Sequence, residues 1–236
     1  MITFKEHIEI SRYSQNEGGI LEYIAKLPPE KRVRITRGIT ESYPLKMQGT
    51  PTDEVKRSFN IYTDVMELVL GQFIMLEQII TGKTQFKTDA ENDLALAQLI
   101  MRPKHHKTFD NEDSVVEEQN KNNILNTPAQ DVYDVLSTFL KNREFILFKQ
   151  FSGVFYELPD EDEENEEGDD PTAEQLFSQQ WYWYSMVRML AKEDITKYEE
   201  IYMLKMAVVM PEMSYIAQKN KIESARQRQS EAMSRL

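Results

Sequence analysis

The chain has 236 residues, of which 40% are hydrophobic and 29% are charged, so it is long enough to bury a core and its surface is well solvated. It contains no cysteine, which excludes disulfides, thiolate metal sites and cysteine nucleophiles. The N-terminal sequence has no apolar stretch typical of a signal peptide, and no segment is apolar enough to span a bilayer. We therefore expect a soluble protein made inside the cell.

The net charge of −12 is concentrated in one short run. Outside it, 30 acidic residues stand against 28 basic ones, a net charge of −2. A nearly neutral body argues against nucleic-acid binding over the whole surface, because phosphate binding needs an excess of basic side chains. The basic clusters at 31–37 and 219–235 are typical of solvated helix faces. The run holds ten acidic residues and no base: Glu157, Asp160, Glu161, Asp162, Glu163, Glu164, Glu166, Glu167, Asp169 and Asp170.

Helical periodicity runs through most of the chain, and glycine and proline stand between the periodic segments, which predicts an all-α fold. In 53–81, apolar residues recur at steps of three and four, so we expect one central, largely buried helix there. The segment near 144–157 is ambiguous, because its aromatic and β-branched residues also suit a small hairpin. The predicted helices cover 18–27, 53–81, 89–101, 111–124, 128–141, 143–156, 172–192, 195–206 and 208–232.

Three of these helices begin with a capping-box pattern, in which a threonine is followed three residues later by Glu or Gln. The threonines are Thr88, Thr127 and Thr172. The acidic run cannot bury its like charges, so we expect a flexible linker at 157–171. It separates an N-terminal helical body, 1–156, from a C-terminal aromatic helical unit, 172–236.

Three local patterns resemble functional motifs, and none fits well. "TGKT" at 81–84 lacks the glycine of a phosphate-binding loop, since Glu77 stands at that position. The acidic run fits a calcium-binding loop loosely, with Glu163 where Asp is usual and no second loop to pair with it. The pair His105-His106 has no third histidine nearby. We therefore expect no catalytic, cofactor-binding or metal site, and no enzyme.

The acidic run is followed by four consecutive aromatic residues, 181–184. At helical spacing, Trp183 shares a face with Val187, which predicts a core position. An acidic neighbour disfavours base stacking, so the adjoining face is predicted to bind a protein partner. That face carries Phe177, Trp181, Tyr184 and Arg188.

The segment "WYWYSMVRMLAKEDITKYEEIYMLKMAVVMPEMSYIAQKNKIE" and the upstream "LIMRPKHHKTFDNED…VYDVLSTFLKNREF" resemble the C-terminal unit of small tailed-bacteriophage proteins, among them tail-assembly chaperones and virion accessory proteins. In those proteins an acidic linker precedes a Trp/Tyr-rich helix, an "LA..DITK.EEI" step and a helix ending in "SY...K". The resemblance covers about residues 90–225, mainly 172–225.

The resemblance implies a non-enzymatic structural or assembly protein of a tailed bacteriophage, either a tail- or neck-associated virion component or a tail-assembly chaperone. It would act by helix-mediated contacts with other phage structural proteins in a multi-copy assembly, in the virion or the host cytoplasm, without cofactor, membrane or direct nucleic-acid contact. The alternative is an acidic adaptor or inhibitor that presents 157–170 to a basic nucleic-acid-binding protein. A hydrolase with an unrecognised carboxylate site is a third hypothesis.

Overall fold

A computed structural model of the chain describes residues 2–14, 19–32, 34–35, 52–84, 86, 88–105, 114–155 and 173–234. The chain forms two compact units. Unit 1 comprises Met1–Asp64 and Met75–Asn142, and unit 2 comprises Val65–Ile74 and Arg143–Leu236. Unit 2 therefore includes 65–74 and 143–155, which the sequence analysis placed in the N-terminal body. The predicted linker at 157–171 lies outside the described residues.

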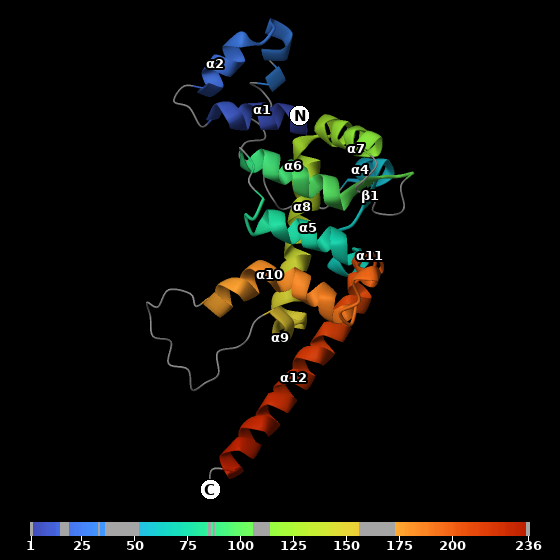
Figure 1. The fold of residues 1–236 in the computed structure, drawn as a ribbon. Helices are drawn as coiled ribbons and strands as arrows, with labels where there is room; N and C mark the ends of the chain where they lie inside the picture. The colour runs from blue at the N-terminus through green and yellow to red at the C-terminus, as the bar shows by residue number, and fades with distance from the viewer. Residues whose placement is uncertain are drawn as a thin grey trace. The chain divides into compact units, whose positions relative to one another are not determined.

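The fold is mainly α-helical, which confirms the predicted class (Figure 1). The helices begin with α1 (Phe4–Ser14), α2 (Gly19–Lys26), α4 (Asp53–Ser58), α5 (Leu70–Ile80), α6 (Asp89–Ile100), α7 (Ser114–Asn126) and α8 (Ala129–Phe145). They continue with α9 (Ser152–Phe155), α10 (Ala173–Leu190), α11 (Tyr198–Tyr202) and α12 (Met206–Ser234). Short 3-10 turns lie at η1 (Val65–Glu67) and η3 (Ile195–Lys197), and η2 (Ile146–Gln150) is a π-helical turn.

The segment 53–81 is not the single helix that its apolar spacing predicted. Helix α4 ends at Ser58, and the chain then forms strand β1 (Phe59–Ile61), which pairs antiparallel with β2 (Met101–Pro103) in the register Phe59↔Pro103. A hydrogen bond from the Tyr62 N–H to the Ile100 carbonyl, 2.8 Å long, extends the pairing. The aromatic Phe59 and Tyr62 and the β-branched Ile61 favour a strand here, although Phe59 and Tyr62 also fit a helical period.

The possible hairpin near 144–157 is also wrong over the described residues 144–155, where the chain stays helical through α8, η2 and α9. The π-helical turn keeps Ile146 and Leu147 buried while Phe145 and Phe148 are exposed. A short apolar run cannot be assigned to helix or strand by periodicity alone, and here no strand partner is supplied. The two paired strands of the described chain lie at 59–61 and 101–103 instead.

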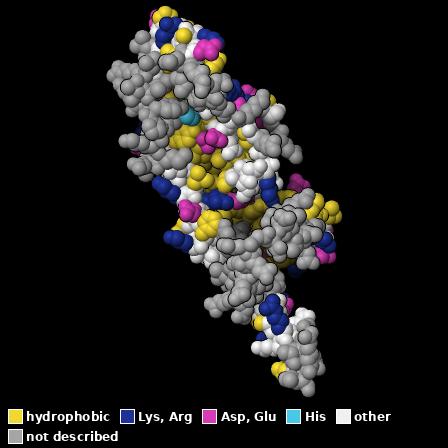
Figure 2. Space-filling view, turned by 90° about the vertical axis from the view of Figure 1, so that its left-hand side faces the viewer, with side chains coloured by type: hydrophobic (Ala, Val, Ile, Leu, Met, Phe, Trp, Pro, Cys, Tyr) yellow, Lys and Arg dark blue, Asp and Glu magenta, His cyan; other side chains and the backbone are white. Residues whose placement is uncertain are grey.

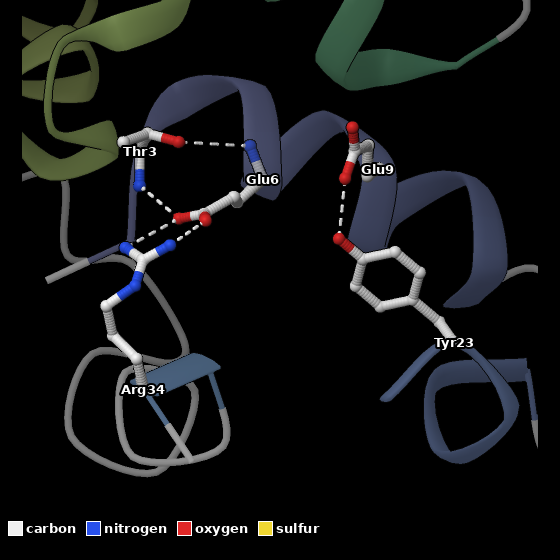
Figure 3. Close-up of polar contacts among 5 residues, drawn as sticks. All are labelled: Thr3, Glu6, Glu9, Tyr23 and Arg34. Carbon is white, nitrogen blue, oxygen red and sulfur yellow. Dashed lines mark hydrogen bonds and ion pairs between the residues drawn. The ribbon is translucent and has the colours of Figure 1, made fainter. Parts of the chain in front are cut away.

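Helix α1 was not predicted, although its start carries a capping box. The Glu6 N–H donates to the Thr3 hydroxyl, 3.3 Å away, and the Thr3 N–H donates to the Glu6 carboxylate, 3.0 Å away (Figure 3). Arg34 pairs with the same carboxylate, and the Tyr23 hydroxyl donates to Glu9 over 2.6 Å. Burial alone would raise the pKa of Glu6, but the Thr3 N–H and the Arg34 guanidinium outweigh it and lower that pKa.

The predicted caps have different outcomes. The Glu91 N–H donates to the Thr88 hydroxyl over 3.2 Å, which confirms the cap of α6. The Thr127 hydroxyl instead donates to the Asn123 carbonyl at the end of the preceding helix, over 3.0 Å. Thr172 lies outside the described residues.

The core of unit 2 is built by α10, α12 and the segment before α5. The Met206 N–H donates to the Leu68 carbonyl and the Leu70 N–H donates to the Leu204 carbonyl, each over 2.8 Å, so that these segments form an antiparallel bridge. The buried apolar side chains of α10 and α12 are Met186, Val187, Met206, Val209, Met210 and Met213. This core holds the predicted aromatic face of α10 in place.

Candidate protein interface on α10

Helix α10 has a buried and an exposed side over the residues whose side chains are described. Val187 and Met186 are buried. Trp183 is half-buried on the same side as Val187, as its spacing predicts, and its ring packs edge-on against Phe73 with 5.5 Å between centroids. Trp181 and Tyr184 are 42% and 43% exposed. The helix therefore contributes to the core of unit 2 on one side and offers aromatic surface on the other.

Three aromatic rings form a continuous surface feature, which we call the aromatic row: Trp181, Tyr184 and Tyr198. The ring of Tyr184 lies 5.6 Å from that of Trp181 and 5.9 Å from that of Tyr198, both edge-to-face. Such pairs fix the orientation of each ring before any partner arrives. Partial burial and a hydrogen bond with Tyr184 raise the pKa of Tyr198. Large preorganised aromatic rings are typical interface anchors.

Arg188 and Phe177 are the other two residues predicted on this face. Arg188 is exposed, and its guanidinium lies 3.3 Å from the Glu193 carboxylate. Exposed pairs of this kind contribute little to stability, so Arg188 stays available to a partner. The side chain of Phe177 lies outside the described residues, as do all the acidic residues of 157–170.

A tight turn after α10 brings Tyr198 next to Tyr184. Lys192 and Glu193 have φ values of 53° and 64°, a left-handed conformation that costs free energy in residues other than glycine. Asp194 then caps the following 3-10 turn, accepting from the Thr196 N–H over 3.1 Å and from its hydroxyl over 2.6 Å. The turn reverses the chain at once, which places α11 against α10 and completes the aromatic row.

A groove lies beside the aromatic row, on the adjoining face of α10. It has a volume of about 290 Å³ and is lined from α9, α10 and α12. Two of its lining residues are joined by a hydrogen bond, because the Tyr182 hydroxyl donates to the Val154 carbonyl over 3.1 Å, and burial raises the pKa of Tyr182. Methionine side chains adapt to irregular partners, which suits a protein-binding groove. Its apolar lining residues are Val154, Met186, Met189, Met213, Ile216 and Ala217.

Unit 1 contains a buried chain of polar side chains. The His7 ring nitrogen Nε2 lies 2.9 Å from the Tyr133 hydroxyl, which donates to the Asp93 carboxylate over 2.6 Å. Because that hydroxyl gives its proton to Asp93, Nε2 is the donor toward it. Burial lowers the pKa of His7 to about 4 and raises that of Asp93. The three residues join α1, α8 and α6 and belong to the core.

Metal-binding clusters and membrane-spanning helices are absent from the described residues. No three His, Asp or Glu side chains among them come close enough together to hold a metal ion. Within the same residues, no helix is both long and apolar enough to cross a membrane. His105 is exposed, and His106 lies outside the described part of the chain.

No protein-family model, curated protein sequence or solved structure matches this chain. The α10 face is therefore characterised by its own geometry. Two residues that contribute to this surface were not predicted from the sequence. Tyr198 enters the row through a turn whose left-handed residues carry no glycine signal, and Val154 reaches the groove from a separate helix. The Asp194-Ile-Thr196 pattern, a typical cap, could have indicated that turn.

Proposed function

We propose that the chain is a non-enzymatic protein that acts through helix-mediated contacts with other proteins. The aromatic row is the observation that supports this proposal most directly. Trp181 and Tyr184 expose two-fifths of their surface while their rings are held edge-to-face. Aromatic side chains that are rigid and exposed bind a partner at low entropic cost, because few rotamers remain to be fixed. The methionine-lined groove on the adjoining face gives such a partner a second point of contact.

The resemblance to tailed-bacteriophage proteins supplies the setting for this contact. In that setting the chain is a tail- or neck-associated virion component or a tail-assembly chaperone. Its partners are other phage structural proteins in a multi-copy assembly, in the virion or the host cytoplasm. Helix-in-groove docking would join them, with Trp181 and Tyr184 as anchors and Arg188 at the edge. This role needs no cofactor, membrane or nucleic acid.

Mass spectrometry of purified phage particles tests this setting. A stoichiometric amount of the chain in mature particles would identify a virion component. Recovery with assembling tails, followed by absence from mature particles, would identify a chaperone. Absence from both preparations would remove the phage role and leave the protein-contact proposal to be tested by itself.

The acidic run supports a second candidate function, an adaptor or inhibitor of a basic nucleic-acid-binding protein. Ten carboxylates within 157–170 would attract a basic surface, and salt would screen the attraction. Deletion of 160–169 distinguishes the two functions. If partner binding survives the deletion and is lost in Trp181→Ala, the aromatic row is the binding surface. The opposite result favours the adaptor. We expect the deletion and Trp181→Ala each to change the melting temperature little.

A further inference from the structure

Helix α12 is apolar on two opposite sides. Its buried side carries Met206, Val209, Met210 and Met213. On the other side, Val208, Tyr215 and Ile222 are 59%, 63% and 54% exposed. These three recur every seven residues, so they form one line along the helix, which we call the α12 stripe. At 3.6 residues per turn the stripe lies roughly 160° around the helix from the buried side.

The α12 stripe is long enough to pair with another helix. From Val208 to Ile222 it extends about 21 Å at 1.5 Å per residue. The described residues 218–230 are all exposed, and Figure 1 shows this part of α12 extending beyond α9 and α10. In the space-filling view, hydrophobic side chains stand beside Lys and Arg toward this end (Figure 2). Apolar residues at seven-residue spacing are typical of helices that pair along their length.

The charges beside the α12 stripe indicate which arrangement of a second helix would fit it. Glu212, Lys219 and Arg226 follow one edge, also at seven-residue spacing. In a parallel second copy, related by a two-fold axis along the helices, the two charged edges would lie on opposite flanks of the pair and would not meet. An antiparallel copy with a two-fold axis near Tyr215 would place Glu212 of each copy beside Lys219 of the other. The edge is therefore complementary to itself only in the antiparallel arrangement.

We propose that the α12 stripe pairs with the α12 stripe of a second copy of this chain, as an antiparallel dimer with Tyr215 near the two-fold axis. Val208 of one copy then lies opposite Ile222 of the other. Lys205 and Arg226 face each other at the ends of the pairing, where solvent screens their repulsion. This inference goes beyond the proposed function, because it concerns α12 and leaves the aromatic row on α10 free for a different partner.

Sedimentation velocity of the full chain over a wide concentration range tests the pairing. We expect a monomer–dimer equilibrium that Ile222→Lys and Tyr215→Lys each weaken by about tenfold or more, because a charge replaces a central apolar contact. Both residues are exposed in the single chain, so the melting temperature should not change at concentrations where the parent chain is monomeric. Ser224→Lys, on the opposite side of the same helix, is the control and should dimerise like the parent chain. A chain that stays monomeric, or a dimer that ignores both stripe variants, overturns the proposal.

Cysteine cross-linking then tests the orientation, and the chain has no cysteine of its own to interfere. Under mild oxidation, Val208→Cys and Ile222→Cys should each remain uncross-linked alone and should cross-link when mixed, because only the mixture places the two thiols opposite each other. Cross-linking of Val208→Cys with itself would indicate a parallel pair and overturn the proposal. Glu212→Lys should weaken the dimer, and adding Lys219→Glu should restore part of it. Restoration is partial because Lys219 also lies 3.7 Å from Glu223 in its own helix.

Discussion

The indole ring of Trp183 packs edge-on against the phenyl ring of Phe73, with 5.5 Å between their centroids. Phe73 is fully buried, whereas Trp181, two residues before Trp183, is 42% exposed. The two tryptophans of the chain therefore have different environments on one helix. Trp183 joins α10 to α5 within the core of unit 2, and Trp181 lies at its surface. Stability and partner binding should consequently respond to different substitutions in the same four-residue aromatic stretch.

Trp183→Ala should lower the free energy of unfolding by about 2–4 kcal/mol, because it removes the contact with Phe73 and leaves a cavity. The value lies toward the lower part of the range for buried aromatic residues, since Trp183 is half-buried. Trp181→Ala is the matched control and should cost about 1 kcal/mol or less. Urea denaturation of both variants measures the difference. Equal losses would show that both tryptophans belong to the core.

The ion pair between the buried Arg102 and the half-buried Glu117 should stabilise unit 1. Arg102 is 1% exposed, and its guanidinium lies 2.6 Å from the Glu117 carboxylate. Glu117→Ala leaves a buried charge without this partner and should cost about 3 kcal/mol or more. The adjacent Glu118→Ala is the control, because Glu118 is exposed and 4.0 Å from Lys121, and it should change stability by about 0.5 kcal/mol or less. Similar losses in the two variants would contradict the account.

The sequence predicts helices and strands well where the apolar residues follow a single spacing. Helix α6 lies at Asp89–Ile100 against a predicted 89–101, and its threonine cap is present. Prediction fails where residues suit two structures. Phe59 fits the helical period of 53–81, yet the strand partner of Phe59–Ile61, Met101–Pro103, lies some forty residues away in sequence. Long-range pairing of this kind leaves no local signal, because the competing helix satisfies the same apolar pattern.

The candidate interface also has a part that the sequence predicts and a part that it does not. The exposure of Trp181 and Tyr184 and the inward position of Trp183 follow from spacing along one helix. The contribution of Tyr198 depends on the turn at Lys192 and Glu193, where neither residue has a strong intrinsic preference for a left-handed conformation. The groove needs three helices to come together, so no single segment could indicate it.

Stability should fall with acidification because of His7. Burial lowers its pKa to about 4 from 6.5, the ordinary value for an exposed histidine. A base whose folded pKa lies below its unfolded pKa contributes full stability above pH 6.5 and loses it as pH falls toward 4. The loss is about 3 kcal/mol at most, and the raised pKa of Asp93 offsets part of it at the acid end.

Chemical denaturation between pH 7 and 4 measures this dependence. His7→Gln removes the titrating group and should flatten the slope across that window, even if it lowers stability at pH 7. His105→Gln, a change at an exposed histidine, should keep the slope of the parent chain. An unchanged slope in His7→Gln would mean that His7 is not the group responsible.

The turn after α10 should be stabilised by glycine. Lys192 adopts a φ of 53°, and glycine adopts this conformation without the steric cost of a Cβ atom. Lys192→Gly should therefore raise the free energy of unfolding by about 0.5–1 kcal/mol. Glu199→Gly, at an exposed position inside α11, is the control and should lower it by about 1 kcal/mol. Thermal denaturation of both variants distinguishes them, and a loss of stability in Lys192→Gly would contradict the assigned turn.

Incorporation of the double variant Trp181→Ala/Tyr184→Ala into purified phage particles or assembling tails, measured against the parent chain by quantitative mass spectrometry, tests the central claim most directly. The exposed Lys197→Ala in the same unit is the control and should be incorporated normally. If the aromatic row anchors a partner, the double variant should keep a cooperative melting transition close to that of the parent chain. Its incorporation should fall by about thirtyfold or more, equivalent to roughly 2 kcal/mol. Normal incorporation of a folded double variant would contradict the claim that α10 carries the binding surface.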